Sequence, residues 1–197
     1  TGLSNVAIGY LALSTEDAHG YNTAIGAGAL QTQNAGADAY NVAVGYDAGL
    51  SVTTGVRNTL IGSLAGDNLA GGSHNVAVGM YALSTEDSHG RNVAIGYSAL
   101  ILQDAGADAY NVAIGYNAGQ AVTTGVRNTI IGGLAGDALT TGVDNVALGY
   151  DAASAITGSN NTCVGSGSGT GIVAGTDNTM IGKGTTLAAN ASNSIVI

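Results

Sequence analysis

Hydrophobic and polar residues alternate along this chain in short segments that recur at a nearly constant interval. Residues 5–10 read NVAIGY, and the same six letters return at residues 92–97 and 111–116. In each segment an Asn is followed by Val or Thr, usually an Ala, an aliphatic residue and a Gly. β-Branched residues that alternate with a period of two are typical of strands. Each segment therefore predicts a short β-strand, with positions one and three after the Asn on one face and position two on the other.

The spacing of these segments predicts how the strands are arranged. The Asn recurs eleven times, with a partial copy at Asn193, at steps of 15 to 19 residues that centre on 17. This period is too short for leucine-rich repeats or propeller blades, and the aliphatic residue at every sixth position of a hexapeptide helix is missing. The sequence predicts an all-β parallel β-solenoid with about 17 residues, two short strands and two turns per coil.

Two columns of identical residues run through the repeats. Asn tolerates the left-handed backbone region, suits the turn that enters a strand, and can form ladders of stacked side-chain amides. Gly supplies a tight bend or a close backbone contact that a Cβ would obstruct. We expect structural roles for the Asn column, Asn5, Asn22, Asn41, Asn58, Asn75, Asn92, Asn111, Asn128, Asn145, Asn161 and Asn178, and for the Gly column, Gly9, Gly26, Gly45, Gly62, Gly79, Gly96, Gly115, Gly132, Gly149, Gly165 and Gly182.

A longer repeat is superimposed on the short one. Residues 5–74 reappear with few changes as residues 75–144, so the sequence indicates a duplicated block of four coils followed by more divergent coils in residues 145–197. We expect residues 1–197 to form a single solenoid domain. The chain begins just before the first repeat and ends within NSIVI, which predicts a fragment of a longer polypeptide.

The strands are apolar on both faces, and such strands are normally covered on both faces. One face can fill the interior of the coil. Each repeat is too short to supply a helix for the other face, so we expect another copy of the chain to cover it. The sequence therefore predicts an obligate homo-oligomer.

Composition excludes several classes of partner. The net charge is −9 with only four Lys and Arg residues, so the chain lacks the basic surface of a nucleic-acid-binding protein and would be repelled by an anionic membrane. No apolar run approaches the roughly 18 residues of a membrane-spanning helix. There are 33 Gly and no Pro, Trp or Phe, which indicates a core of small and aliphatic side chains. The single Cys163 replaces Ala in the inward column, where we expect it to pack as a small hydrophobic residue.

The segments NVAIGYLAL, NTAIGAGAL and NVAVGYDAG resemble the head repeats of trimeric autotransporter adhesins (YadA-like). The linking segment TTGVRNTLIG and the ending ASNSIVI are similar to the repeat arrays of phage tail-fibre proteins. The resemblance covers essentially the whole chain. It implies left-handed β-rolls that form an intertwined or side-by-side homotrimer, located extracellularly on a virion tail fibre or a bacterial cell surface. The repeats of the adhesin heads are shorter, so the outer turns of this chain are longer.

Candidate chemistry is sparse. His19 and His89 each follow a Glu-Asp pair, at residues 16–17 and 86–87, and a His beside two acids can hold a metal or act as a general base. The alternative is a polar outer turn copied by the duplication. We favour this alternative, because a metal site would need ligands that converge from several coils. The Gly-rich GSGSGTG at residues 165–171 lacks the Lys of a phosphate-binding loop. We therefore expect no catalytic residue, no metal and no cofactor, and the chain is not expected to be an enzyme.

The two steps of 19 residues carry the longest outer turns, and these turns are the candidates for surface binding. They include Asp38, Tyr40, Asp108 and Tyr110, and a tyrosine ring beside a carboxylate suits a sugar. A solvated turn in which Tyr covers the coil edge is the alternative. Five further tyrosines, each five residues after an Asn of the column, are expected to form a discontinuous stripe. They either pack along the coil edge or stack against a glycan: Tyr10, Tyr46, Tyr97, Tyr116 and Tyr150.

Together these patterns predict a structural and adhesive fibre segment, the shaft or head of a tail fibre or surface adhesin. The expected partners are two further copies of the chain and a cell-surface glycan or protein receptor. One alternative is a subunit of a homopolymeric extracellular filament. Less favoured alternatives are an ice-binding solenoid, a glycan-binding solenoid and a glycan-cleaving fibre.

Overall fold

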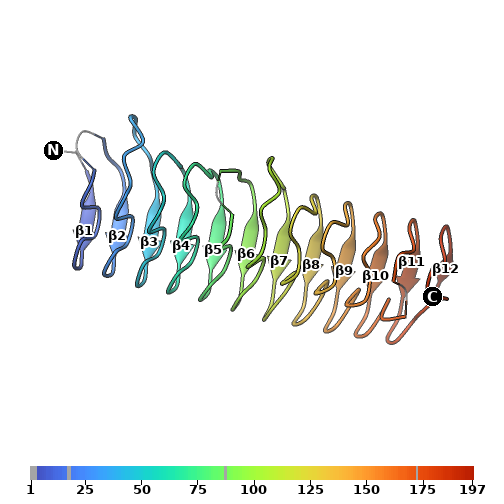
Figure 1. Cartoon of the computed structure of the whole chain (residues 1–197). Helices are drawn as coiled ribbons and strands as arrows, with labels where there is room; N and C mark the ends of the chain where they lie inside the picture. Colours follow the sequence, from blue (N-terminus) through green and yellow to red (C-terminus); the bar gives the residue numbers. More distant parts are fainter. Residues whose placement is uncertain (1–3, 17–18, 87, 172) are drawn as a thin grey trace.

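The structure is a computed structural model, and it describes residues 4–16, 19–86, 88–171 and 173–197. Twelve short strands lie side by side in chain order along a rod, with the two termini at opposite ends (Figure 1). The strands are β1 (Val6–Ile8), β2 (Thr23–Ile25), β3 (Val42–Val44), β4 (Thr59–Ile61), β5 (Val76–Val78), β6 (Val93–Ile95), β7 (Val112–Ile114), β8 (Thr129–Ile131), β9 (Val146–Leu148), β10 (Thr162–Val164), β11 (Thr179–Ile181) and β12 (Ile195–Val196).

All neighbouring strands are parallel, and each pairs with the strand one coil further along the chain. The register matches the repeat: Val76 of β5 lies opposite Val93 of β6, and Val78 lies opposite Ile95. A strand that returns to the same sheet after one turn of about 17 residues defines a coil. The all-β parallel β-solenoid predicted from the sequence is thus confirmed.

The partial copy at the C-terminus has a different register from the one we expected. Thr179 pairs with Ile195, and the backbone N–H of Ser194 donates to Oδ1 of Asn178 at 3.1 Å. Ser194 therefore occupies the Asn column, and Asn193 lies one position before it. The register follows the apolar residues of the strand rather than the identity of the Asn.

The expected second strand of each coil is absent from the part of the chain that the structure describes. After each strand the backbone instead passes through turns with positive φ at positions four and six after the Asn, and in most coils at position eight as well. Leu64, for example, has a φ of 57°, and its N–H donates to the carbonyl of Tyr46 in the previous coil at 2.9 Å. A left-handed conformation costs a non-glycine residue about 1–2 kcal/mol, and hydrogen bonding between coils offsets this cost.

The interior of the solenoid is narrow. Position two of nearly every strand and nearly every Ala at position seven point inward and are buried. Most inward strand residues are Ala, but Leu60 and Ile130 stand in two of the coils, and a Gly follows each of them at position eight. At Gly49 an added Cβ would lie 2.7 Å from Leu60 and 2.9 Å from Leu30. Large side chains in one coil therefore fill the space left by small residues in the next.

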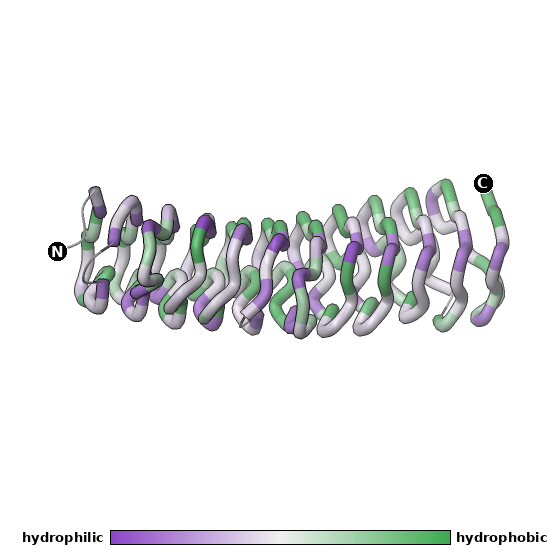
Figure 2. Tube along the Cα trace, turned by 90° about the horizontal axis from the view of Figure 1, so that it is seen from above, coloured by the Kyte–Doolittle hydropathy of each residue, from purple (hydrophilic) through white to green (hydrophobic). Residues whose placement is uncertain are grey.

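The repeat is visible in the hydropathy of the chain. Hydrophobic and hydrophilic segments recur at corresponding places in successive coils (Figure 2). The two longer coils accommodate their extra residues beside a buried glutamine. In one of them Oε1 of Gln33 accepts a hydrogen bond from Asn41 at 2.7 Å, and its Nε2 donates to the carbonyl of Thr53 at 3.0 Å. Gln103 forms the same two contacts in the duplicated block.

Candidate functional site

The Asn column connects successive coils through the backbone. Oδ1 of each Asn accepts the backbone N–H of the Asn in the next coil, and in most coils Nδ2 donates to a carbonyl three residues before that next Asn. For Asn128 these partners are the N–H of Asn145 at 3.0 Å and the carbonyl of Gly142 at 2.8 Å. Direct amide–amide bonds of the kind we expected also occur, as between Asn178 and Asn161 at 3.0 Å. The side chain therefore replaces a missing strand partner at the point where the sheet ends.

The left-handed conformation lies one residue before the Asn, not at the Asn itself. All twelve residues that precede the column have positive φ, and they include Tyr, Arg, His and Asp side chains. We expected the Asn to take this conformation because of its local preferences. Since the Asn backbone N–H must point along the rod to the previous coil, the reversal of the chain occurs at the residue before it.

The Gly column brings the backbones of successive coils together. Each Gly of the column has a φ between 126° and 143°. A Cβ at Gly96 would lie 2.2 Å from the carbonyl oxygen of Gly115, and the other members of the column except Gly182 meet the next Gly in the same way. No side chain fits at these positions. The GSGSGTG segment has the same explanation, because Gly165, Gly167 and Gly169 occupy positions four, six and eight, where positive φ recurs in the other coils.

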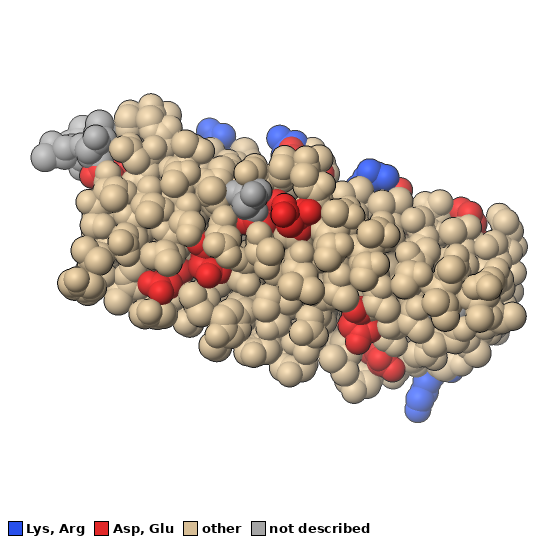
Figure 3. Space-filling view, in the orientation of Figure 1, with Lys and Arg blue, Asp and Glu red and all other residues tan. Residues whose placement is uncertain are grey.

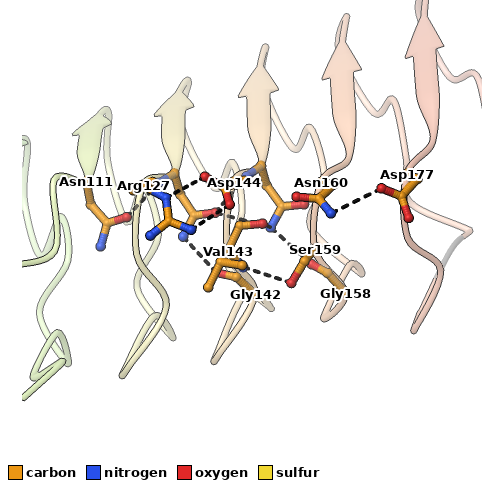
Figure 4. Close-up of polar contacts among 11 residues, drawn as sticks. Asn111, Arg127, Gly142, Val143, Asp144, Gly158, Ser159, Asn160 and Asp177 are labelled. Atoms are coloured by element: carbon orange, nitrogen blue, oxygen red, sulfur yellow. Dashed lines mark hydrogen bonds and ion pairs between the residues drawn. The ribbon is translucent and has the colours of Figure 1, made fainter.

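The residues that precede the Asn column form an exposed row along one edge of the rod, which we call the outer row. Arg127 forms two hydrogen bonds of 2.7 Å with Asp144 in the next coil, and Nδ2 of Asn160 donates to Asp177 at 3.1 Å (Figure 4). The hydrogen bond and charge of Arg127 lower the pKa of Asp144. Toward the middle of the upper edge in Figure 3 blue side chains lie beside red ones, whereas most of this face carries no charge.

The candidate residues of the long outer turns belong to this row or support it. Asp38 and Asp108 accept the backbone N–H groups of Gly20 and Gly90, at 3.2 and 3.1 Å. The ring of Tyr40 stacks on Tyr21 with centroids 4.9 Å apart and an interplanar angle of 9°. The structure thus brings each Asp–Tyr pair to the coil edge, where part of the carboxylate and one ring face already have a partner within the chain.

In the duplicated block an arginine takes the place of Tyr21. Arg91 lies 2.8 Å from Asp108, donates a hydrogen bond to the hydroxyl of Tyr110 and lies over the Tyr110 ring at 5.4 Å. The hydrogen bond to Tyr110 and the charge of Asp108 raise the pKa of Arg91. The two long turns therefore present different chemistry, with stacked aromatic rings in one block and a cation–aromatic pair in the other.

The tyrosines five residues after the Asn lie on the surface. Tyr97 and Tyr116 stack with centroids 5.5 Å apart. Tyr10 and Tyr46 are separated by the coil that carries Ala27, and the gap forms a shallow pocket with Asp47 at its side. The hydrogen bond and charge of Asp47 raise the pKa of Tyr46. These rings form short groups rather than one continuous stripe.

The outer face of the sheet is apolar and uncovered. Positions one and three of each strand point outward and carry Val, Thr, Ile or Leu along the whole rod. Ile61, Ile131 and Ile181 are 39%, 38% and 40% exposed. In β2 to β11 the inward residue between these two positions is completely buried. One face of the sheet thus forms the core, and the other offers two parallel rows of aliphatic side chains to the surroundings.

The histidine turns lie close to buried acids. Nδ1 of His19 lies 3.9 Å from Glu16, and Nδ1 of His89 lies 3.8 Å from Glu86. Asp17 and Asp87, the other acids of these motifs, lie outside the described residues. Asp104, which sequence reasoning did not connect with His89, comes from the following coil and joins Glu86 and His89. Aligning the repeats on the Asn column would have revealed Glu86 at a position that is Val, Leu or Ile in most other coils.

Comparison with protein-family models, with curated proteins and with solved structures returned no match to this chain. Its class follows from the fold itself: twelve in-register parallel strands at one repeat per coil make this chain a β-solenoid repeat protein. In the described ranges no helix is long and apolar enough to span a bilayer.

Proposed function

We propose that this solenoid is a structural and adhesive fibre segment, in which three copies pack side by side through the outer faces of their sheets. The uncovered aliphatic face carries the proposal. Because a parallel sheet is normally buried on both faces, an apolar face that extends over twelve strands requires a partner. In line with the adhesin and tail-fibre repeats that the sequence resembles, the assembly is a homotrimer of left-handed coils on a virion or cell surface.

The regularity of this face favours a second copy over an unrelated partner. Its side chains repeat at the strand spacing of about 4.8 Å, in register from β1 to β12. A partner that packs along the whole face must repeat at the same interval, and another copy of the chain does so. The charges are consistent with this arrangement, since Arg127 and Asp144 lie in the outer row rather than on the strands.

The assembled rod would present its outer row and long turns to a receptor. Three equivalent chains display Tyr40, Tyr110 and their neighbours in triplicate, so weak contacts with a glycan or protein gain strength through effective concentration. A stiff rod also spaces whatever precedes or follows it. A homopolymeric filament formed end to end uses the same lateral packing but places its specific contacts at the terminal coils.

An ice-binding function has one specific observation in its favour. The outward position one is Thr in five strands, at Thr23, Thr59, Thr129, Thr162 and Thr179, and the aliphatic residue at position three accompanies each of them. Such a face presents hydroxyl and methyl groups together on one side of the sheet. Ice binding requires this face to be open in solution, whereas the fibre proposal requires it to be covered.

Sedimentation equilibrium of the chain at micromolar concentration separates these proposals. A trimer of the 19.1 kDa chain is expected. Val112→Lys places a charge on the outer face and should shift the protein toward monomer, while Gln120→Lys, at an exposed turn, serves as the matched control. A folded wild-type monomer would overturn the fibre proposal, and thermal hysteresis from that monomer would establish ice binding instead.

Receptor binding is tested separately on the trimer. Fluorescently labelled protein is incubated with intact bacterial cells, with and without periodate oxidation of their glycans or protease treatment. Loss of binding after periodate is expected for a glycan receptor, and loss after protease for a protein receptor. Tyr40→Ala combined with Tyr110→Ala should weaken binding without changing the sedimentation profile. A trimer that binds no cells would limit the segment to a spacer.

A further inference from the structure

An interior column of the solenoid holds a buried carboxylate in the middle of the rod. The residue eleven positions after the Asn points inward and is buried and aliphatic in five described coils, at Val52, Leu69, Val122, Leu139 and Ile156. In the coil of β5 this residue is Glu86, and it is 0% exposed. Buried charged groups in proteins are normally paired or coordinate a metal ion. The column is also polar at Glu16, Gln33 and Gln103, so polar residues enter it in the first two coils of each duplicated block.

Two further ligand groups lie beside this carboxylate. His89, three residues later in the same coil, directs Nδ1 to within 3.8 Å of Oε1 of Glu86. This nitrogen is shielded from solvent and has no hydrogen-bond partner among the described residues. Asp104 approaches from the next coil, so that one ligand atom from each of Glu86, His89 and Asp104 lies within 4.8 Å of the other two. The ligands thus converge from two coils. The sequence alone did not show that this requirement for a metal site is met.

We propose that Glu86, His89 and Asp104 bind a divalent transition-metal cation of the Zn²⁺ class. One imidazole nitrogen and two carboxylate oxygens match the ligands that Zn²⁺ takes at about 2.0–2.2 Å, with water in the remaining position. Ligands around such a tetrahedral ion lie roughly 3.4 Å apart, so small side-chain rotations bring the three groups into place. Ca²⁺ takes about six to eight oxygen ligands and fits this set poorly. The cation balances the two carboxylates.

The duplicated block contains a natural comparison for this site. Glu16 and His19 repeat the first two ligands, with Nδ1 of His19 at 3.9 Å from Glu16. The residue equivalent to Asp104 is Asn34, whose backbone N–H donates to Thr53 as that of Asp104 donates to Thr123. The two turns therefore share backbone contacts but differ in one ligand. We expect a strong site in the second block and a weak one in the first.

Metal binding would join the coils of β5 and β6 where the second block begins. Because the cation binds the folded chain, it stabilises that chain by mass action. This role is independent of the fibre proposal, since the ligands come from one chain and do not depend on the outer face of the sheet. If the chain binds no metal, the proposed trimer still stands. If the chain is not a trimer, the proposed metal site still stands.

The test uses the whole chain without an affinity tag, stripped with a chelator and titrated with ZnCl₂ in a calorimeter. One Zn²⁺ per chain is expected in the tight-binding range. Asp104→Asn, which copies the first block at an exposed position, should weaken zinc binding at least about tenfold. Loss of a residue that only hydrogen-bonds a metal ligand already lowers metal affinity by about that factor, and loss of the ligand itself lowers it more. Asn34→Asp should add a second equivalent. His74→Asn, which removes an exposed histidine of the outer row, is the control and should change neither value.

Cobalt supplies an independent signature of the ligands. Co²⁺ in the stripped protein should give the visible absorption bands of a four-coordinate site, and these should disappear in Asp104→Asn and in His89→Asn. Circular dichroism and the thermal midpoint without metal establish that each variant is folded. Absence of Zn²⁺ uptake by the wild-type chain would overturn the proposal. So would binding that Asp104→Asn leaves unchanged while Asn34→Asp adds no second site.

Discussion

Oδ1 of Asn58 accepts the backbone N–H of Asn75, one coil further along the rod, at 2.9 Å. Nδ2 of Asn58 donates to the carbonyl of Gly72 at 2.8 Å. The side chain therefore satisfies one donor and one acceptor of the next coil, at a place where the strand has ended and no backbone partner is available. Both asparagines are buried, so water cannot take over either bond.

Asn58→Ala should destabilise the protein by about 3 kcal/mol, because a buried N–H and a buried carbonyl lose their partners. The matched control is Asn22→Ala. Asn22 accepts the N–H of Asn41 at 3.0 Å, but its Nδ2 has no hydrogen-bond partner among the described residues. We expect about half the loss there. Urea unfolding followed by circular dichroism, at one fixed protein concentration, measures the free energy of unfolding of both variants. Equal losses of this free energy would show that the Nδ2 bond contributes nothing.

Gly62 tests the close contact between coils. An added Cβ would lie 2.6 Å from the carbonyl group of Gly79, and the φ of Gly62 is 134°. Backbone cannot move aside without separating the coils, so Gly62→Ala should prevent correct stacking and yield little folded protein. Gly36 is the control, because its Cβ would meet nothing within 4 Å at a φ of 69°. Gly36→Ala should cost only about 1–2 kcal/mol of left-handed strain. Similar yields and thermal midpoints for the two variants would contradict this account.

The fit between coils in the core predicts a non-additive pair. Gly49→Ala places a Cβ 2.7 Å from Cδ1 of Leu60 and should destabilise by about 1–3 kcal/mol through overpacking. Leu60→Ala alone creates a cavity and should cost about 2–5 kcal/mol. The double variant removes the clash with Leu60 and fills part of the space, so its loss should be smaller than the sum of the two. Additive losses in urea unfolding would show that the two residues do not share the same space.

The strands and their stacking could be predicted because they depend on side-chain periodicity. Val and Ile at positions one and three, with Gly at position four, define both the strand and its register. The turns that complete the coil could not be predicted in this way. Leu64 and Tyr81 take positive φ without any local preference for it, because hydrogen bonds between coils require that backbone path. We assigned a second strand to this part, and the structure has turns instead.

The candidate metal site could likewise be predicted only in part from the sequence. The Glu86 and His89 pair is evident from the chain as a motif of closely spaced polar residues. Asp104 lies fifteen residues beyond His89 and reaches the motif only because consecutive coils stack. Its place beside the motif therefore depends on the length of one coil, which residue types alone do not reveal. The burial of Glu86 was likewise hidden until the interior column was known.

Cys163 offers a probe of the C-terminal coils. It is completely buried, its Sγ lies against Gly169, and burial raises the pKa of its thiol from 9.0 to about 12. At pH 8 only about 10⁻⁴ of such thiols are ionised, and the thiolate is the reactive form. Iodoacetamide should therefore modify the native protein at least about a thousandfold more slowly than the protein unfolded in guanidinium chloride. Rapid modification of native protein would show that the coils of β10 and β11 open readily.

The same shift predicts how stability depends on pH. Since the folded protein favours the neutral thiol, the contribution of Cys163 is complete below the ordinary pKa of 9.0 and is lost as the pH rises from there toward about 12. Cys163→Ala, which installs the residue found at this position in most other strands, should fold normally and lack this alkaline loss. Urea midpoints of both proteins at pH 7 and pH 10 measure it. From pH 7 to pH 10 the urea midpoint of the wild-type protein should fall relative to that of Cys163→Ala. A difference in midpoint that is the same at both pH values would contradict the buried neutral thiol.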